Sequence, residues 1–426
     1  MITKGNCLLF SIFLLYCLIC LPVSALIEVW NTTPPGGLIA DLAISDDGSR
    51  VIVGTMGGLA IVYDQNGTLL WETRVPGSVL VGCQGNGSAF ILASREDMVM
   101  NKGGVRFYDH TGAERWYVNT GAVEVLDLPA KTNRLIIGNR IGETTVLNDR
   151  GEEIAQFNES PGNSVIADLS ITDDGKVFSY AVYEMYPRVR YVTIDTKKKS
   201  SFKSPSSGGK TGVGSDPVIR QVVISSDGKF IATAGGEGSQ GILTLYANNG
   251  TILWSKKMDS IRDIEISRNG SFVFTGTTGG NISCYSQTAN LSWVFPVGAE
   301  VTSLSMVPEK ELLAVGDAQG DIYLFNATGS LFGTLLWIGH ISEFPSSEIS
   351  QVKLARNGTA LVAAVNGKSL YYFEKESEHV PETDILSQTS PAPTAPLTPE
   401  AGLFTVSGLI EIWNAWKNLT APLWTT

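Results

Sequence analysis

The sequence is short of cysteine, histidine and clustered basic residues, and each shortage excludes a class of protein. Only 5 cysteines and 3 histidines occur in 426 residues. Three cysteines lie within residues 1–25, and the remaining two, Cys83 and Cys284, cannot make a disulfide framework. The histidines are isolated and have no zinc-site spacing. The formal net charge is -11 with no stripe of Lys and Arg, so nucleic acid is not an expected partner.

The motifs of common enzyme classes are also missing. There is no Gly-x-Ser-x-Gly elbow. The glycine-rich stretch 206–216 lacks the Lys-Ser/Thr pair and the following helix of a phosphate-binding loop. We therefore predict that the protein is not an enzyme and has no catalytic residue, metal or cofactor.

Residues 1–25 have the pattern of an export signal. Lys4 precedes an apolar run over 7–21, and small residues permit cleavage after Ala25. The alternative is an uncut anchor, because the stretch 7–27 approaches the length that spans a bilayer. We expect cleavage and an extracellular or cell-surface location.

Glycosylation sequons give a second indication of export. Eleven asparagines begin Asn-x-Ser/Thr, although part of this excess is turn chemistry, because Asn-Gly is a good hairpin turn. Asn158 is the weakest sequon, since Pro161 follows its Ser160. The remaining sequons are candidate surface glycosylation sites: Asn31, Asn66, Asn86, Asn249, Asn269, Asn281, Asn290, Asn326, Asn357 and Asn418.

Residues 26–376 are built from a repeated unit of about 40 to 50 residues. Each unit predicts four short strands, a to d, with an Asp-Gly or Asn-Gly turn between a and b and a second glycine turn between c and d. Eight units predict an all-β, eight-bladed propeller of four-stranded antiparallel blades. The first halves of the units are 39–54, 79–93, 123–138, 166–181, 219–234, 261–276, 301–316 and 349–364.

The fourth strands indicate how the ring closes. Seven of them carry an aromatic residue after the second turn: Trp71, Trp116, Phe157, Phe202, Trp254, Trp293 and Trp337. The eighth unit ends without a fourth strand, but residues 26–36 resemble 68–77, with Trp30 matching Trp71. We therefore expect the N-terminal strand to complete the last blade and leave no free sheet edge in the ring. Trp337 lies four residues out of register in this alignment.

These repeats resemble two propeller families. Residues 301–326 resemble WD-repeat blades, and "YDQNGTLLW" (63–71) and "YDHTGAERW" (108–116) are similar to the tryptophan-docking repeats of quinoprotein-like (PQQ-like) eight-bladed propellers. The resemblance covers about residues 26–376. It implies the fold strongly and the function weakly.

The resemblance also raises an enzymatic alternative. Quinone-dependent dehydrogenases of this kind have a vicinal cysteine pair, calcium ligands and a catalytic Asp, and this chain has no adjacent cysteines. The aromatic repeats are better explained as packing between blades. A divergent quinoprotein or a carbohydrate-active enzyme using channel carboxylates stays as the alternative, and an envelope assembly factor is a third possibility by analogy.

One aligned position of the first strands is mostly polar and would line the central channel. It carries Asp41, Asp168, Gln221, Asp263, Ser303 and Gln351, with Leu80 and Val125 as exceptions. Asp127, Glu265 and Lys353 fall two residues on and point the same way in a strand. The channel would hold a cation or a small polar ligand, or it is a tunnel whose polar groups are solvated by water.

The two faces of the ring differ in their connections. The a–b and c–d turns share one face, are short, and carry seven of the sequons. The b–c and d–a connections share the other face and are longer: 94–104, 183–189, 203–217, 236–241 and 338–348. Function tends to reside in loops on a rigid scaffold, so we predict partner binding at Tyr183, Tyr186, Arg188 and Phe344. The alternative is that these loops are neutral insertions.

The C-terminal region has a different composition. Residues 377–402 are rich in Pro, Ser and Thr and predict an extended linker. Residues 403–426 are rich in Trp, and 403–419 have the periodicity of an amphipathic helix. Membrane-surface contact, docking on the propeller and pairing with an envelope protein all stay open for it. The expected partners are other cell-envelope proteins or surface polysaccharide.

Overall fold

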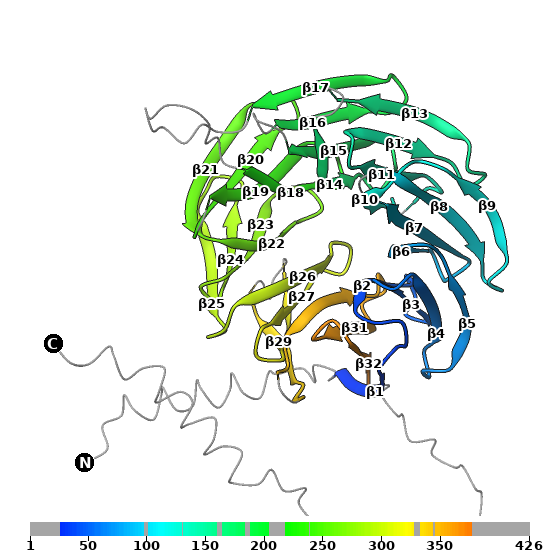
Figure 1. Cartoon of the computed structure of the whole chain (residues 1–426). Helices are drawn as coiled ribbons and strands as arrows, with labels where there is room; N and C mark the ends of the chain where they lie inside the picture. The colour runs from blue at the N-terminus through cyan, green and yellow to red at the C-terminus, as the bar shows by residue number, and fades with distance from the viewer. Residues whose placement is uncertain are drawn as a thin grey trace, which may run out of the picture. The chain divides into compact units, whose positions relative to one another are not determined.

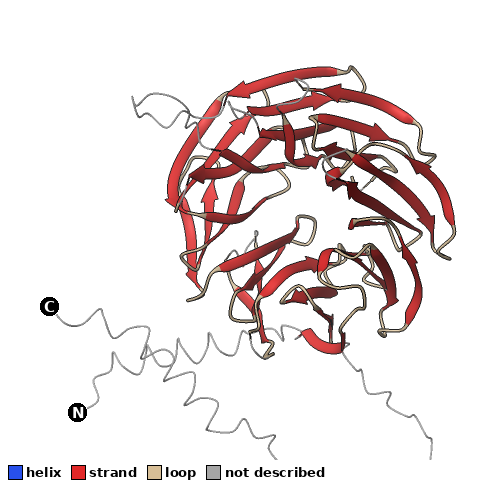
Figure 2. Cartoon of the chain, in the orientation of Figure 1, coloured by secondary structure: helices blue, strands red, loops and turns tan. Residues whose placement is uncertain are grey.

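The fold follows from 32 strands in the described part of the chain. The computed structural model describes residues 26–97, 101–129, 131–159, 164–183, 188–203, 218–237, 239–327, 333–343 and 346–376. Within them the strands form eight four-stranded antiparallel sheets, and no helix is present that could cross a membrane (Figure 2). The expected export signal (1–25), linker (377–402) and C-terminal helix (403–419) lie outside the described residues.

The eight sheets are the blades of a ring, and the prediction of an eight-bladed propeller is confirmed (Figure 1). The a strands surround the centre: β2 (Ile39–Ile44), β6 (Ser78–Gln84), β10 (Val123–Asp127), β14 (Val165–Ile171), β18 (Val218–Ile224), β22 (Ile261–Ile266), β26 (Val301–Val307) and β30 (Ile349–Leu354). Blades 1 to 8 are numbered in this order.

The remaining strands of each blade run outward from the centre. The b and c strands are β3 (Arg50–Thr55), β4 (Leu59–Asp64), β7 (Ala89–Asp97), β8 (Lys102–Asp109), β11 (Leu135–Asn139), β12 (Glu143–Leu147), β15 (Val177–Tyr183), β16 (Arg188–Thr193), β19 (Phe230–Glu237), β20 (Gln240–Ala247), β23 (Phe272–Thr277), β24 (Asn281–Ser286), β27 (Leu312–Asp317), β28 (Asp321–Asn326), β31 (Ala360–Val365) and β32 (Ser369–Lys375). The d strands on the outside are β5 (Leu69–Arg74), β9 (Glu114–Val118), β13 (Glu153–Asn158), β17 (Lys198–Lys203), β21 (Ile252–Asp259), β25 (Leu291–Pro296), β29 (Leu335–His340) and β1 (Leu26–Thr32).

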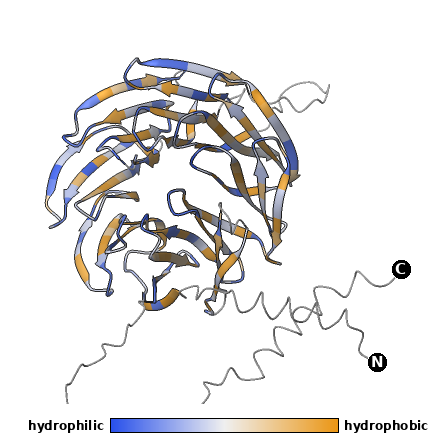
Figure 3. Ribbon diagram, turned by 180° about the vertical axis from the view of Figure 1, so that it is seen from behind, coloured by the Kyte–Doolittle hydropathy of each residue, from blue (hydrophilic) through white to orange (hydrophobic). Residues whose placement is uncertain are grey.

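The hydrophobic core lies between neighbouring blades. Strand β31 is buried along its whole length, whereas β5 alternates between exposed and half-buried residues. One core cluster joins Ile39, Val51 and Ile61 of blade 1 to residues of blade 8, including Val362. Strands that pack against a blade on both sides read as continuous hydrophobic runs, whereas the outer strands carry more hydrophilic residues (Figure 3).

The N-terminal strand closes the ring, as the sequence predicts. Strand β1 pairs with β32, so blade 8 has the order β1-β32-β31-β30. Trp30 lies opposite Tyr372 after a β-bulge, as Trp71 lies opposite Val62 in blade 1. The Trp30 ring stacks on Tyr372 at 5.3 Å between ring centroids. The N-terminal strand therefore occupies the position of a d strand, residue for residue.

Aromatic residues of the d strands dock on the next blade. The indole Nε1 of Trp30 donates to the carbonyl of Gln65 at 3.0 Å, in the c–d turn of blade 1. The same contact joins Trp116 to Asp149 at 2.8 Å, and Trp254 to Gln287 at 3.0 Å. The turn glycine must be small: a Cβ on Gly67, which has a φ of 79°, would lie 2.8 Å from the Trp30 ring. The aromatic repeat is thus a joint between blades.

The register of three aromatics differs from the sequence alignment. Trp337 lies opposite Leu324, as Trp293 lies opposite Cys284, so its apparent shift comes from a longer c–d connection. Phe157 and Phe202 lie two residues beyond the tryptophan position, opposite Thr144 and Val189. Phe202 still stacks on Tyr246 of the next blade, at 6.1 Å between ring centroids.

Candidate functional site

The polar position of the a strands lies at a repeated bulge. In seven a–b pairs the register shifts at this position, for example between Ile39 and Asp41 and between Ile261 and Asp263. Blade 2, which carries Leu80 there, has no shift. A bulge re-aims a side chain, and here the side chains turn toward the next blade.

The carboxylates and one hydroxyl at this position bind the backbone of the next blade. Asp41 accepts hydrogen bonds from the backbone N–H of Leu42 at 2.9 Å and of Val81 in blade 2 at 3.0 Å. Hydrogen bonds to a backbone N–H of the next blade recur along the ring. Ser303 makes its bond with one hydroxyl oxygen, where the aspartates have two carboxylate oxygens. The inter-blade bonds run from Val222 to Asp168 at 2.8 Å, from Leu304 to Asp263 at 2.7 Å, and from Val352 to Ser303 at 3.3 Å.

A second set of acceptors lies two residues further along the a strands. Asp127 accepts from the N–H of Ile171 at 3.0 Å, and Glu265 accepts from Met306 at 3.2 Å. Two hydroxyls act in the same way: Ser170 accepts from Ile224 at 3.2 Å, and Ser305 from Leu354 at 3.1 Å. Together the two sets form the channel clasps, which always reach from one blade to the blade that follows.

Three joints depart from this pattern. Between blades 2 and 3 the two positions are Leu80 and Gly82, and neither residue has a side-chain oxygen that could accept a hydrogen bond. Between blades 5 and 6, Gln221 donates from Nε2 to Asp263 at 3.0 Å. Between blades 8 and 1, the Oε1 of Gln351 is buried without a hydrogen-bond partner, and Arg356 instead pairs with Asp46 at 3.2 Å.

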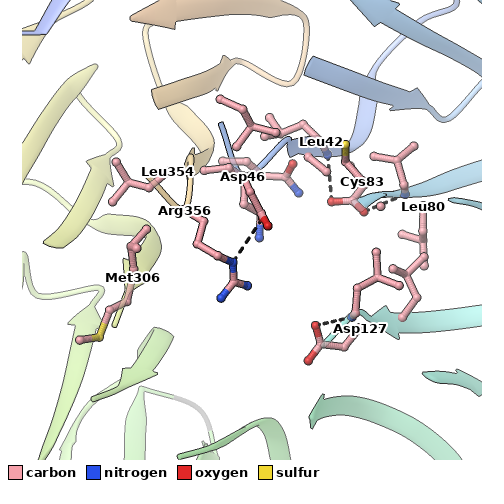
Figure 4. Close-up of a pocket in the computed structure, with 18 of the residues that line it drawn as sticks. Leu42, Asp46, Leu80, Cys83, Asp127, Met306, Leu354 and Arg356 are labelled. Atoms are coloured by element: carbon pink, nitrogen blue, oxygen red, sulfur yellow. Dashed lines mark hydrogen bonds and ion pairs between the residues drawn. The ribbon is translucent and has the colours of Figure 1, made fainter. Parts of the chain in front are cut away.

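The channel opens into a cavity of about 460 Å³ near the turn face, the face formed by the a–b and c–d turns. Its lining includes Asp41, Asp127, Gln351 and Lys353 of the predicted set, and also Cys83. Figure 4 shows Arg356 and Asp127 on opposite sides of the open space. Cys83 is half-buried at the cavity wall, whereas Cys284 is buried.

Burial raises the pKa of the channel carboxylates. Their side chains border the channel, but the surrounding blades keep most bulk water away from them. The ionised form therefore loses hydration, which favours the protonated form. Burial raises the pKa of Asp127 to about 6 and that of Asp168 to about 7. Burial, followed by the negative charge of Asp263, raises the pKa of Glu265 to about 8. Lys353 opposes these shifts in Asp41, Asp263 and Glu265.

The geometry favours a structural role for most of these groups. Their oxygens already accept hydrogen bonds from backbone N–H groups, and a buried N–H that lost such an acceptor would be costly. Among the described residues, no group of three His, Cys, Asp or Glu side chains is arranged to hold a metal ion. The sequence located the ring of polar residues but not its clasps, because their partners belong to the neighbouring blade.

Two of the four predicted binding residues, Tyr183 and Arg188, lie on the loop face, which the b–c and d–a connections form. Tyr183 ends β15 and is 51% exposed, and Arg188 begins β16 and is also exposed. Tyr186 and Phe344 lie outside the described residues. Sequence reasoning missed three exposed hydrophobic residues in connections of this face: Leu38, Met56 and Ile141.

The candidate sequons differ in how free their asparagines are. Those with exposed side chains are Asn31, Asn66, Asn86, Asn249, Asn269 and Asn290. Asn281, Asn326 and Asn357 are half-buried, and Asn418 lies outside the described residues. Asn357 is committed, because its Nδ2 donates to the carbonyl of Asp47 at 2.9 Å across the ring closure.

Sequence comparison relates the chain to an envelope protein family. The model of the family described as outer membrane protein assembly factor BamB matches residues 27–234. No curated protein matches the sequence of this chain. The match covers the first four blades and part of the fifth, so it is a resemblance over part of the propeller.

Solved structures confirm the fold. The chain is similar to the C-terminal WD40 domain of Sif2, with 14% identity and a TM-score of 0.64, covering 82% of this chain and 98% of that one. The computationally designed protein Ika8 is similar with 16% identity and a TM-score of 0.62, and the match covers 82% of this chain and 99% of Ika8. BamB from Moraxella catarrhalis is similar with 14% identity and a TM-score of 0.58, and the match covers 82% of this chain and 100% of that BamB chain. The chain is an eight-bladed propeller with WD-like and quinoprotein-like repeats, as its sequence predicts.

Proposed function

We propose that this protein is an exported, glycosylated propeller that binds another envelope protein through its loop face. The observation that carries the proposal is the distribution of exposed hydrophobic side chains. Leu38, Met56 and Ile141 are exposed to 41%, 58% and 38%, and all lie in connections of the loop face. In the described a–b and c–d turns, no large hydrophobic side chain is exposed, and the exposed hydrophobic residues nearest to them lie at the starts of the outer strands β5, β21 and β25.

Two of these residues form one patch. The backbone N–H of Met56 donates to the carbonyl of Leu38 at 2.8 Å, so blade 1 presents both side chains together. Methionine adapts its shape to different partners, and apolar anchors of this kind carry much of the energy of an interface. Tyr183 and Arg188 extend the proposed surface to blade 4, and we include Tyr186 and Phe344 on the sequence argument alone.

The partner class follows from the resemblance and the N-terminus. The matching family is described as an outer membrane protein assembly factor, which supports a scaffold role in an envelope. The export pattern of residues 1–25 and the sequons support an extracellular location. The commitment of channel oxygens to backbone groups weighs against the enzymatic alternative. Membrane-surface contact through 403–419 is part of the proposal.

Site-specific photo-crosslinking in intact cells tests the binding face. Crosslinkers at Met56 and Ile141 sample the loop face, and matched crosslinkers at the exposed His110 and Lys197 sample the turn face. We expect protein adducts from the loop face only, and their loss in a Leu38→Glu, Met56→Glu variant that unfolds at an unchanged temperature. Adducts from the turn face alone, or polysaccharide adducts in place of protein, would contradict the proposal.

A further inference from the structure

Three outer strands begin with exposed hydrophobic residues. We use the term rim pair for the two residues that precede the docking tryptophan of a d strand. The rim pair of β5 is Leu69 and Leu70, exposed to 48% and 40%. That of β21 is Ile252 and Leu253, exposed to 42% and 41%. In β25 the first member, Leu291, is 53% exposed.

The fold does not require hydrophobic residues at these places. Blade 2 has Glu114 and Arg115 immediately before Trp116, and both are exposed. Blade 4 begins its d strand with the exposed Lys198 and Lys199. Charged residues therefore satisfy the same strand start, so the hydrophobic rim pairs need another explanation.

A sequon precedes each of these three hydrophobic rim pairs. Asn66, Asn249 and Asn290 lie in the c–d turns of blades 1, 5 and 6, at most four residues before the exposed side chains. All three asparagines are exposed. The c–d turns of blades 2, 3 and 4, over 109–113, 148–152 and 194–197, contain no sequon. Blade 7 has a sequon at Asn326 but a half-buried rim pair, and in blade 8 the exposed Val29 follows no sequon. In blades 1 to 6, hydrophobic rim pairs and c–d-turn sequons occur in the same blades.

We propose that N-linked glycans on Asn66, Asn249 and Asn290 lie over the rim pairs of their own blades. This inference rests on the proposed export and glycosylation. A sugar attached within four residues reaches these side chains, and its C–H faces can cover hydrophobic surface that water would otherwise contact. The turn face would then carry a shield at its outer rim, leaving the loop face open to the partner.

The modification needs a sugar donor and a transferase of the exporting membrane. The side-chain Nδ2 forms a bond to C1 of the sugar, while the C1–O bond to a lipid-linked phosphate donor breaks. The amide nitrogen loses one proton, and the lipid phosphate leaves with the bonding electron pair. Asn357 is a poor acceptor in the folded ring, because its Nδ2 donates to the carbonyl of Asp47 in another blade, whereas the Nδ2 of Asn290 donates only to the hydroxyl of Thr288 in its own exposed turn, at 3.2 Å.

Glycopeptide mapping of the protein purified from its native envelope tests site use. We expect glycans on Asn66, Asn249 and Asn290, and an unmodified peptide at Asn357. Absence of glycan from all three sites would overturn the inference. It would leave the binding face standing, because the crosslinking experiment does not depend on glycans.

Removal of the glycans tests the covering role. The triple variant Asn66→Gln, Asn249→Gln, Asn290→Gln should bind a hydrophobic dye such as bis-ANS severalfold more strongly at an unchanged unfolding temperature. Adding Leu69→Glu, Leu70→Arg, Ile252→Glu, Leu253→Arg and Leu291→Glu should restore low dye binding. Asn86→Gln is the matched control, because this exposed sequon has no rim pair. Dye binding that stays low in the triple variant would contradict the covering role.

Discussion

Neighbouring blades are joined at two distances from the ring axis, and the two joints use opposite chemistry. Near the channel, side-chain oxygens of one blade accept hydrogen bonds from backbone N–H groups of the next, as Asp41 does from Val81. At the outside, an indole N–H donates to a backbone carbonyl of the next blade, as Trp30 does to Gln65. Both joints point the same way around the ring.

The two joints compensate for one another. Blades 2 and 3 lack a channel clasp, and there Trp116 donates to Asp149. Blades 1 and 2 have the clasp of Asp41, and there the Trp71 indole nitrogen is buried without a hydrogen-bond partner. The ring therefore tolerates the loss of one joint where the other is intact.

Blades 3 and 4 add a third kind of joint. Glu159, which follows β13, accepts hydrogen bonds from Arg190, from Tyr180 at 2.7 Å and from Lys199 at 3.0 Å, all in blade 4. Burial alone would raise the pKa of Glu159, but these bonds lower it to about 2. This buried network occurs where the outer joint has Phe157 in place of an indole.

The largest loss of stability should follow from a substitution at the joint between blades 8 and 1, which has no channel clasp and closes the ring. Trp30→Ala should lower the free energy of unfolding by about 3 to 5 kcal/mol, because it removes buried aromatic surface and the bond to Gln65. Trp71→Ala, where Asp41 still joins the blades, should cost roughly 1 kcal/mol less. Urea denaturation measures both, and equal losses would show that the two joints do not compensate.

Removal of a channel clasp should have the next largest effect. Asp41→Ala leaves the backbone N–H of Val81, a buried residue, without an acceptor, at an expected cost of about 2 to 3 kcal/mol. Ser303→Ala is the control, because Ser305 still joins the same two blades. Its expected cost is about 1 kcal/mol. A loss for Ser303→Ala as large as that for Asp41→Ala would refute the clasp assignment.

A glycine pair separates the docking contact from backbone strain. Gly67 and Gly298 have similar φ values of 79° and 83°, but a Cβ on Gly298 would meet no atom within 4 Å. Alanine at Gly298 should cost about 1 kcal/mol from the left-handed backbone alone. Alanine at Gly67 should cost about 1 to 2 kcal/mol more, because it also displaces the Trp30 ring. Thermal unfolding of the two variants gives the difference directly.

The channel acids should make the free energy of unfolding depend on pH. The pKa values of Asp168 and Glu265, about 7 and 8, exceed the ordinary values near 4, so the folded state holds protons that the unfolded chain releases. Their contribution to stability is present below pH 4 and is lost as the pH rises through 7 to 8.

The expected slope is up to about 1.4 kcal/mol per pH unit for each group. Asp168→Asn and Glu265→Gln should flatten the decline in unfolding free energy between pH 5 and pH 8. Glu159→Gln should change stability at the acidic end of the pH range. The lowered pKa of Glu159 contributes stability that is present above pH 4.5 and is lost as the pH falls toward 2. A decline that persists in the double variant Asp168→Asn, Glu265→Gln would assign it to other groups.

The sequence predicted the ring because its information is local and repeated. Eight a–b turns, seven c–d turns and the match of Trp30 to Trp71 predicted the number of blades and the closing strand. The alignment misjudged Trp337, because extra residues in a turn shift the numbering without shifting the strand pairing. It also treated Phe157 and Phe202 as direct replacements, although each lies two residues beyond the tryptophan position.

The site was predictable only in part. Alignment of the repeats placed Asp41, Asp168 and Asp263 at one position of the a strands, and the alternation of a strand added Asp127 and Glu265 two residues further on. The partner of each oxygen is an amide in the following blade, and no pattern within a blade encodes it. The exposed Leu38 and Met56 were missed because a single hydrophobic residue in a loop carries no periodic pattern.

The closing strand also determines how the ring would respond to force. Leu26 pairs with Lys375 and Thr32 pairs with Leu370, so the entry and exit points of the propeller lie side by side at one end of a single antiparallel ladder. Tension applied between these points would break the β1–β32 hydrogen bonds one after another, as a zipper opens, rather than loading them all in shear. A tether at one end of the chain would leave the ring unstressed, whereas tethers at both ends would pull on its least resistant seam.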